Sequence, residues 1–228
     1  MFGSNIYKKL IKKLKKKGLE FSTDWHSEIY PNYLLLRHDV DFSVNHAYEI
    51  AKIDKSQNIF STFFFMLTSN MYNLLSNTNR KLVQEIKEMG HKISLHFDPT
   101  VYKKIDEFKK EREIFEKNFM VEVDIVSIHR PGVFLNNNNI DLFGSKQTYQ
   151  NKYFKKMKYI SDSSGRDVSH DLDNYLESKK KTGLHLLLHP IWWVDESSNQ
   201  TVTLDEWKKK YLSFLTTEIR ENCKTYKG

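Results

Sequence analysis

The feature that most constrains the fold of this chain is a repeated alternation of short apolar runs with longer segments of helical period. The runs have strand length and are rich in β-branched or aromatic residues, so they predict strands. Strands that alternate with helices favour a parallel sheet with crossover helices. The sequence therefore predicts an α/β fold with strands over Tyr33–Arg37, Phe60–Leu67, Lys92–His96, Asp124–His129, Lys158–Ser161 and Leu184–His189.

The segments between and after these runs predict helices. The helix over 80–89 is expected to stop at Gly90, as a C-terminal glycine favours, and the closing helix over 205–222 carries Trp207, Tyr211, Leu212, Leu215 and Ile219. The polar stretch over 135–152, with four consecutive Asn residues, is expected either to shape a substrate mouth or to be a disordered loop. The predicted helices are Val44–Gln57, Arg80–Met89, Tyr102–Asn118 and Asp205–Asn222.

Length and charge limit the classes of protein. A chain of 228 residues with 39% hydrophobic content can bury a substantial core and is expected to form one domain over 1–228. Of its net charge of +7, much lies in seven lysines between positions 8 and 17, within a basic amphipathic segment over 1–20. This segment is expected either to contact an anionic membrane surface or phosphate groups, or to pack an apolar stripe on the core under a solvated lysine face.

Several classes are disfavoured. The N-terminus has no signal-like apolar region and no apolar run could span a bilayer, so a cytoplasmic location is expected. Cys223 is the single cysteine, so a metal would be held by His and carboxylate side chains. No helix-turn-helix, zinc or RNA-recognition motif supports nucleic-acid binding, and no Gly-x-Ser-x-Gly motif supports a serine hydrolase.

Two carboxylates follow the first predicted strand. Asp39 and Asp41 are two residues apart, so their side chains share one side of the strand. When two carboxylates lie this close together, their like charges favour protonation of one of them unless a cation neutralises the pair. The pair therefore suggests a metal site, and the alternative is a solvated turn.

Later strand ends repeat the pattern. His96 and Asp98 close the third strand, and His96 is the better ligand. His129 follows the fourth strand and is suited to bind metal or substrate. Beside it, the planar guanidinium of Arg130 is suited to a carboxylate or phosphate.

Two further residues complete the set of candidates. Asp162 follows the fifth predicted strand and is expected to pair with Arg130. His189 ends the last strand immediately before a proline, a position suited to a general acid.

In this order the motifs resemble those of the NodB-type polysaccharide deacetylases, carbohydrate esterase family 4, over roughly 34–190. The variant of the first motif is similar to that of deformylases of lipid-linked formamido-arabinose and of sugar deacetylases of surface-polysaccharide clusters. The resemblance implies a distorted (β/α) barrel and metal-dependent removal of an N-acyl group. It is carried by Arg37-His38-Asp39-Val40-Asp41, Ser61-Thr62-Phe63-Phe64-Phe65, Gly90-His91-Lys92-Ile93, Arg130-Pro131-Gly132, Asp162-Ser163-Ser164 and Leu188-His189-Pro190.

The resemblance also implies roles for these residues. Asp39 is the catalytic base, Asp41 and His96 bind a divalent metal, and His189 protonates the leaving amine, with Arg130 and Asp162 orienting base and acid. Zinc is the first expectation, and cobalt, nickel, manganese and iron suit the same ligands. The family's second metal histidine, four residues after the first, is replaced here by Thr100. The third ligand is therefore expected to be His129 or, alternatively, Asp98, or else metal binding is weak or lost.

The substrate expectation follows from location and aromatic content. A cytoplasmic enzyme would act on a nucleotide- or lipid-linked amino sugar with an acetyl or formyl group, rather than on chitin or peptidoglycan. Trp192 and Tyr149 are candidates to stack on the sugar ring, and core packing is their alternative. The rival to an enzyme is a degenerate relative that binds sugar without turnover.

Overall fold

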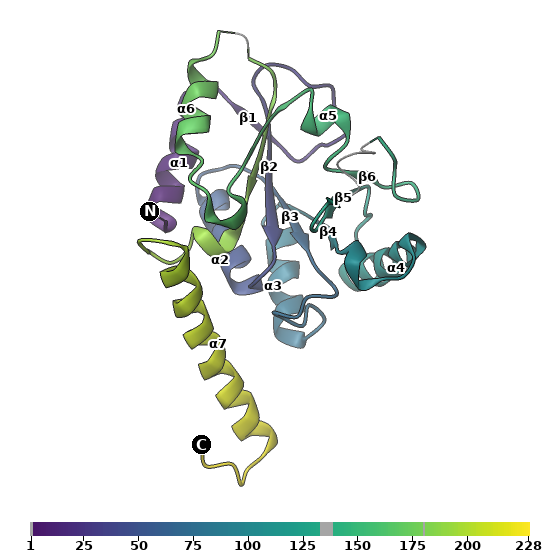
Figure 1. The fold of residues 1–228 in the computed structure, drawn as a ribbon, viewed down its shortest axis with the longest axis vertical. Helices are drawn as coiled ribbons and strands as arrows, with labels where there is room; N and C mark the ends of the chain where they lie inside the picture. The colour runs from purple at the N-terminus through teal and green to yellow at the C-terminus, as the bar shows by residue number, and fades with distance from the viewer. Residues whose placement is uncertain (1, 133–138, 180) are drawn as a thin grey trace.

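The computed structural model describes residues 2–132, 139–179 and 181–228, and it confirms the α/β prediction. The strands form one parallel sheet in the order β6-β5-β4-β3-β2-β8-β7, and β1 also pairs with β2 (Figure 1). The sheet curls into the distorted barrel that was expected. Its strands are β1 Glu20–Ser22, β2 Tyr33–Val40, β3 Thr62–Phe65, β4 Lys92–Phe97, β5 Ile125–Ile128, β6 Lys146–Gln147, β7 Lys158–Ser161 and β8 Leu184–Leu188.

Helices cross between the strands. The predicted helix over 102–118 begins only at Phe108, because two 3₁₀ turns, Pro99–Val101 and Ile105–Glu107, precede it. The short helices over 151–154 and 169–177 were not predicted. Of the polar stretch 135–152, residues 135–138 lie outside the described residues, and the rest includes β6. The helices are α1 Ser4–Lys16, α2 Val44–Ser56, α3 Asn77–Glu88, α4 Phe108–Phe119, α5 Asn151–Phe154, α6 Ser169–Glu177 and α7 Gln200–Asn222.

Strand β2 is the centre of the molecule, and all eight of its residues are buried. Successive side chains of β2 point to opposite faces of the sheet, so they enter two different hydrophobic clusters. Leu34 and Leu36 pack with the helices in the larger hydrophobic cluster, whereas Leu35 faces a second cluster with Trp25 and Phe64 inside the curled sheet. By the same alternation Arg37 and Asp39 share the inner face with Leu35.

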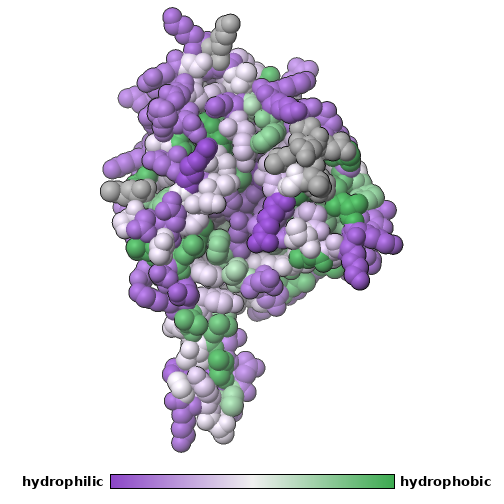
Figure 2. Space-filling view, in the orientation of Figure 1, coloured by the Kyte–Doolittle hydropathy of each residue, from purple (hydrophilic) through white to green (hydrophobic). Residues whose placement is uncertain are grey.

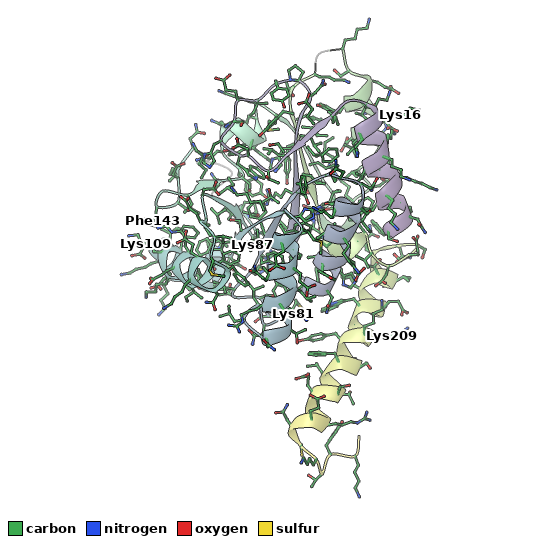
Figure 3. All side chains as sticks on the ribbon, turned by 180° about the vertical axis from the view of Figure 1, so that it is seen from behind. Lys16, Lys81, Lys87, Lys109, Phe143 and Lys209 are labelled. Carbon is green, nitrogen blue, oxygen red and sulfur yellow. The ribbon has the colours of Figure 1, made fainter. Side chains whose placement is uncertain are left out.

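Helix α1 packs its apolar stripe on the core, which was one of the two alternatives expected for the basic segment. Tyr7, Ile11 and Leu14 are fully buried, while the lysines of the segment are exposed. Lys16, at the end of α1, lies at the periphery of the molecule (Figure 3). The apolar stripe is therefore occupied by the core, and a contact with a charged surface would have to rest on the lysines alone.

The last helix, α7, begins five residues before its predicted start. It projects away from the sheet (Figure 1), and its side chains Leu212 and Ile219 are 56% and 44% exposed. No helix in the described parts of the chain combines the length and apolarity needed to cross a membrane.

Candidate active site

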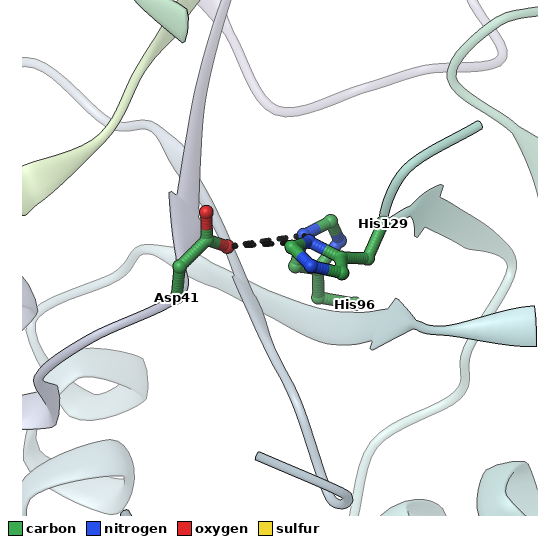
Figure 4. Close-up of side chains that lie close together, drawn as sticks. All are labelled: Asp41, His96 and His129. Atoms are coloured by element: carbon green, nitrogen blue, oxygen red, sulfur yellow. Dashed lines mark hydrogen bonds and ion pairs between the residues drawn. The ribbon is translucent and has the colours of Figure 1, made fainter. Parts of the chain in front are cut away.

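The carboxyl ends of four strands of the sheet bring the predicted polar residues together. Asp41 follows β2, His96 lies in β4, His129 follows β5 and His189 follows β8. Asp41 Oδ1 lies 3.2 Å from His96 Nε2 and 3.8 Å from His129 Nδ1, and the two imidazole nitrogens are 3.2 Å apart (Figure 4). Parallel strands place their ends at one edge, which is why residues far apart in sequence meet here.

This group has the donor set of a divalent metal site. Its three ligand atoms, one carboxylate oxygen and two imidazole nitrogens, lie within 4.8 Å of one another. Asp41 Oδ1 is buried and accepts no hydrogen bond from the described residues. Burial opposes ionisation of Asp41, but His96 and His189 hold its pKa below the usual value. A buried anionic oxygen without a hydrogen-bond donor, facing two imidazoles, fits a cation.

His129 rather than Asp98 completes the group. Asp98 Oδ1 accepts hydrogen bonds from the Thr100 amide and hydroxyl, at 2.9 and 2.6 Å, and so begins the turn after β4. Asp98 Oδ2 lies 3.9 Å from His129 Nε2, on the far side of the imidazole from Asp41. Asp98 is therefore placed to orient His129, as carboxylates commonly do for metal-binding histidines.

Asp39 sits beside the metal group but is already paired. Arg37 donates to both of its carboxylate oxygens, at 2.8 and 2.6 Å, and Ser127 donates to Oδ2 at 3.0 Å. Burial opposes ionisation of Asp39, but the charge of Arg37 holds its pKa far below the usual value. His96 Nε2 is 3.6 Å away. Asp39 is thus an ionised carboxylate fixed at the edge of the site.

His189 faces the same site from β8. Its Nδ1 lies 2.5 Å from Asp162 Oδ1, its backbone N–H donates to both Asp162 oxygens, and Trp193 Nε1 donates to Oδ2 at 2.6 Å. Burial opposes protonation, but the charge of Asp162 raises the pKa of His189 to about 9. The Nε2 atom of His189 lies 3.7 Å from Asp41 Oδ2. A protonated imidazole therefore points at the metal group.

The expected pairing of Arg130 with Asp162 was wrong. Arg130 is exposed, with a φ of 49°, and makes no hydrogen bond or ion pair with the described residues. Asp162 binds His189 and Trp193 instead of Arg130, because β7 pairs directly with β8. The arginine that orients Asp39 is Arg37, two positions earlier in the same strand.

The aromatic candidates are core residues. Trp192 is 5% exposed and its ring packs 5.6 Å from that of Phe2. Tyr149 is 7% exposed, and the guanidinium of Arg37 lies over its ring at 5.1 Å. Neither ring has a free face for a sugar, so the expectation of sugar stacking was wrong and the alternative of core packing applies to both.

The comparisons with known proteins find similarity among solved structures. Neither a protein-family model nor a curated protein matches the sequence. Solved structures of carbohydrate esterase family 4 are similar. A pseudoenzyme of that family from Bacillus anthracis is 16% identical over 81% of this chain and 62% of that one (TM-score 0.47). The chitin deacetylase of Colletotrichum lindemuthianum is 14% identical over 78% and 81% (0.48), and a peptidoglycan deacetylase of Bacillus subtilis is 14% identical over 85% and 99% (0.49).

Three supporting residues were missed by reasoning from sequence. Arg37 shares the face of Asp39, so the i, i+2 rule could have found it. Ser127 lies two residues before His129, so the same rule places it on the face of the site. Trp193 had no such signal, because its role depends on the pairing of β7 with β8. A buried network also lies behind β2, where His38 contacts the Leu188 carbonyl at 3.0 Å.

Proposed function

We propose that this chain is a metal-dependent hydrolase that removes an N-acetyl or N-formyl group from an amino sugar. The observation that carries the proposal is the pairing of an ionised base and a protonated acid across one metal-binding group. Asp39 Oδ2 lies 3.6 Å from His96 Nε2, and His189 Nε2 lies 3.7 Å from Asp41 Oδ2. Asp39 and His189 are each held by a buried partner, Arg37 or Asp162. Such a pair, with opposed pKa shifts, is the arrangement that amide hydrolysis needs.

The protein side chains supply the proton transfers. Asp39 accepts a proton from the attacking water as the water oxygen bonds to the acyl carbon. His189 gives its proton to the sugar nitrogen as the carbon–nitrogen bond breaks, and the products are a carboxylic acid and the free amine. Asp162 holds the His189 imidazole and stabilises its charge, and Arg37 keeps Asp39 ionised and in place.

Asp41, His96 and His129 would hold the metal. Its chemistry there is to polarise the acyl carbonyl and to lower the pKa of water. One carboxylate and two imidazoles suit zinc first, and cobalt, nickel, manganese or iron as well. His129 would supply the third ligand, for which the resemblance expects a histidine at the position of Thr100.

The substrate we propose is an acylated amino sugar linked to a nucleotide or a lipid, within the cytoplasm. The exposed lysines of α1 support this class, because they present positive charge to phosphate groups on a substrate or on an anionic surface. The mixed charge elsewhere gives no support to nucleic acid as a partner.

Elemental analysis and amine release test the proposal together. We expect about one divalent ion per chain in the wild type, none in Asp41→Ala or His96→Ala, and an unchanged content in His170→Ala, which alters an exposed histidine of α6. The wild type should release amine from acetylated or formylated nucleotide sugars in a panel assay.

A protein that stays metal-free after zinc, cobalt and manganese are supplied would contradict the proposal. The second candidate, a degenerate sugar-binding protein, would then lead, because Thr100 replaces a ligand that the resemblance expects. Tight sugar binding by metal-free protein, without amine release, would establish that candidate.

A further inference from the structure

The outer half of α7 has no packing partner in the described chain. Near its start Thr203 is buried, and Trp207 packs edge-on against Phe42 with ring centroids 5.4 Å apart. From Leu212 to Asn222, every residue except Thr216 is exposed. A helix of 23 residues is roughly 35 Å long, and most helical stability in proteins comes from packing an apolar face.

That outer half is apolar on one side. Leu215 and Ile219 lie one helical turn apart and are 36% and 44% exposed, and Leu212 and Phe214 are more than half exposed. Figure 2 shows hydrophobic side chains running down the projecting helix. Ser213 and Thr217 lie on the opposite side at helical spacing. Exposed apolar side chains gathered in this way mark an interaction surface.

A second unfilled apolar surface lies at the root of the same helix. A groove of about 570 Å³ runs between α7 and the body, lined by Phe42, Val44, Met71, Tyr72, Trp207 and Phe214, among others. Met71 and Leu75, beside the groove, are each 38% exposed. One chain therefore carries both an apolar helix end and an apolar groove.

The charges of α7 indicate which partner fits. The helix has four basic side chains, Lys208, Lys209, Lys210 and Arg220, and four acidic ones, Asp205, Glu206, Glu218 and Glu221. A neutral helix gains nothing from an anionic membrane, whose surface helices are rich in lysine and arginine. Its inner lysines already pair within the chain, Lys208 with Asp205 and Lys209 with Glu206, so the charges of the helix leave its pairing with a copy of itself unopposed.

We infer that two copies of this chain associate through α7, paired antiparallel about a two-fold axis near Leu215. This geometry lays the end of each helix, with Ile219, against the groove at Trp207 and Tyr211 of the other copy. A two-fold interface uses the same patch on both partners. Residues 208–222 of α7, together with the eleven residues of the body that line the groove, match the roughly 20–30 residues a side of a stable interface.

The association bears on the site without depending on the proposed function. Phe42 directly follows Asp41, and the Tyr72 hydroxyl donates to the Val40 carbonyl at 2.6 Å. The groove thus shares its wall with the candidate active site, and a second α7 over it would cover that side from water.

Sedimentation equilibrium of the full chain tests the inference. We expect a mass of twice 27.2 kDa for the wild type, and a dissociation constant raised by at least roughly 100-fold in Leu215→Glu/Ile219→Glu. Both residues are exposed in the single chain, so circular dichroism and thermal unfolding at low concentration should be unchanged. The matched control, Ser213→Glu/Thr217→Glu, adds the same charge to the other side of α7 and should remain a dimer.

A cross-link tests the two-fold geometry. Leu215→Cys in a Cys223→Ser background should form an intermolecular disulfide on mild oxidation, whereas wild-type Cys223, far from its own copy in an antiparallel pair, should not. A wild type that is monomeric at 100 µM overturns the inference. So does a dimer that survives Leu215→Glu/Ile219→Glu, or a monomer that binds anionic phosphatidylglycerol vesicles through these residues.

Discussion

Two aspartates separated by one residue have different environments in this protein. Asp39 has its oxygens taken by Arg37 and Ser127, whereas Asp41 keeps a buried oxygen without a hydrogen-bond donor among the described residues. In the proposed mechanism, this difference distinguishes the base, Asp39, from the metal ligand, Asp41. The spacing of the two residues alone does not make this distinction.

Asp39→Asn should therefore retain the metal and lose activity. The amide cannot accept a proton, so we expect kcat to fall by about 10²–10⁴-fold with the metal content of the wild type. Asp41→Asn should lose both. Elemental analysis beside amine release checks this, and loss of metal from Asp39→Asn alone would exchange the two roles.

The arginine needed for stability and activity should be Arg37 rather than Arg130. Arg37→Gln removes both hydrogen bonds to Asp39 from a site with no exposure, so we expect a stability loss of about 3–5 kcal/mol and little remaining activity. Arg130→Gln alters an exposed side chain and should leave kcat and the unfolding free energy nearly unchanged. Urea titration and amine release measure both, and an inactive, stable Arg130→Gln would restore the role first expected for Arg130.

At the scale of single residues, the sequence predicted most of the residues that meet at the site but few of the side chains that hold them in place. Asp41, His96, His129 and His189 meet because each ends a strand, which periodicity reveals. Arg130 also follows a strand, but its positive φ turns the chain away from the site. Trp193 reaches the site from the turn after β8, and no sequence pattern predicts the position of that turn.

Among the elements, α4 carries a buried carboxyl group, Glu111, that makes the stability of the folded state depend on pH. Burial raises the pKa of Glu111 to about 7, and the Tyr102 hydroxyl donates to it at 2.5 Å. In the unfolded chain the carboxyl ionises near 4.5. Between these values the folded state holds a proton that the unfolded state has lost, so stability falls as pH rises.

Glu111→Gln should remove this dependence. The variant keeps an oxygen for Tyr102 but cannot ionise, so relative to wild type it should gain about 3 kcal/mol of unfolding free energy between pH 4.5 and pH 8. Urea titrations at pH 5 and pH 8 measure the gain. A difference between the two proteins that is the same at both pH values contradicts it.

Element boundaries were predictable where periodicity was undisturbed. β7 matches its predicted bounds, whereas α4 starts six residues late, because Tyr102 and Lys104 are extended and the 3₁₀ turn Ile105–Glu107 comes first. The position of α7 was not predictable, because an amphipathic pattern does not say whether its apolar face packs on the same chain.

In the whole molecule, one buried hydroxyl of α1 reaches the polar network at the centre. Tyr7 donates to Asp54 Oδ1 at 2.7 Å and lies 3.2 Å from His38 Nε2. Tyr7→Phe leaves a buried carboxylate oxygen without this donor, so we expect a loss of about 1–3 kcal/mol. Lys12→Ala, on the exposed face of α1, should stay within about 0.5 kcal/mol of wild type. Equal urea midpoints for both variants would contradict this role of Tyr7.

The order of strands in the sheet also determines when, during synthesis of the chain, the sheet can be completed. Strand β2 lies between β3, which follows it closely, and β8, whose Leu188 pairs with His38 across 150 positions of sequence. During synthesis, one edge of the most buried strand stays open until nearly the whole chain has left the ribosome. Pairing over such a distance is slow, and open apolar edges aggregate. Chains that stop before β8 should therefore be insoluble, and the strand that closes this edge is also the one that carries His189, the proposed general acid, at its end.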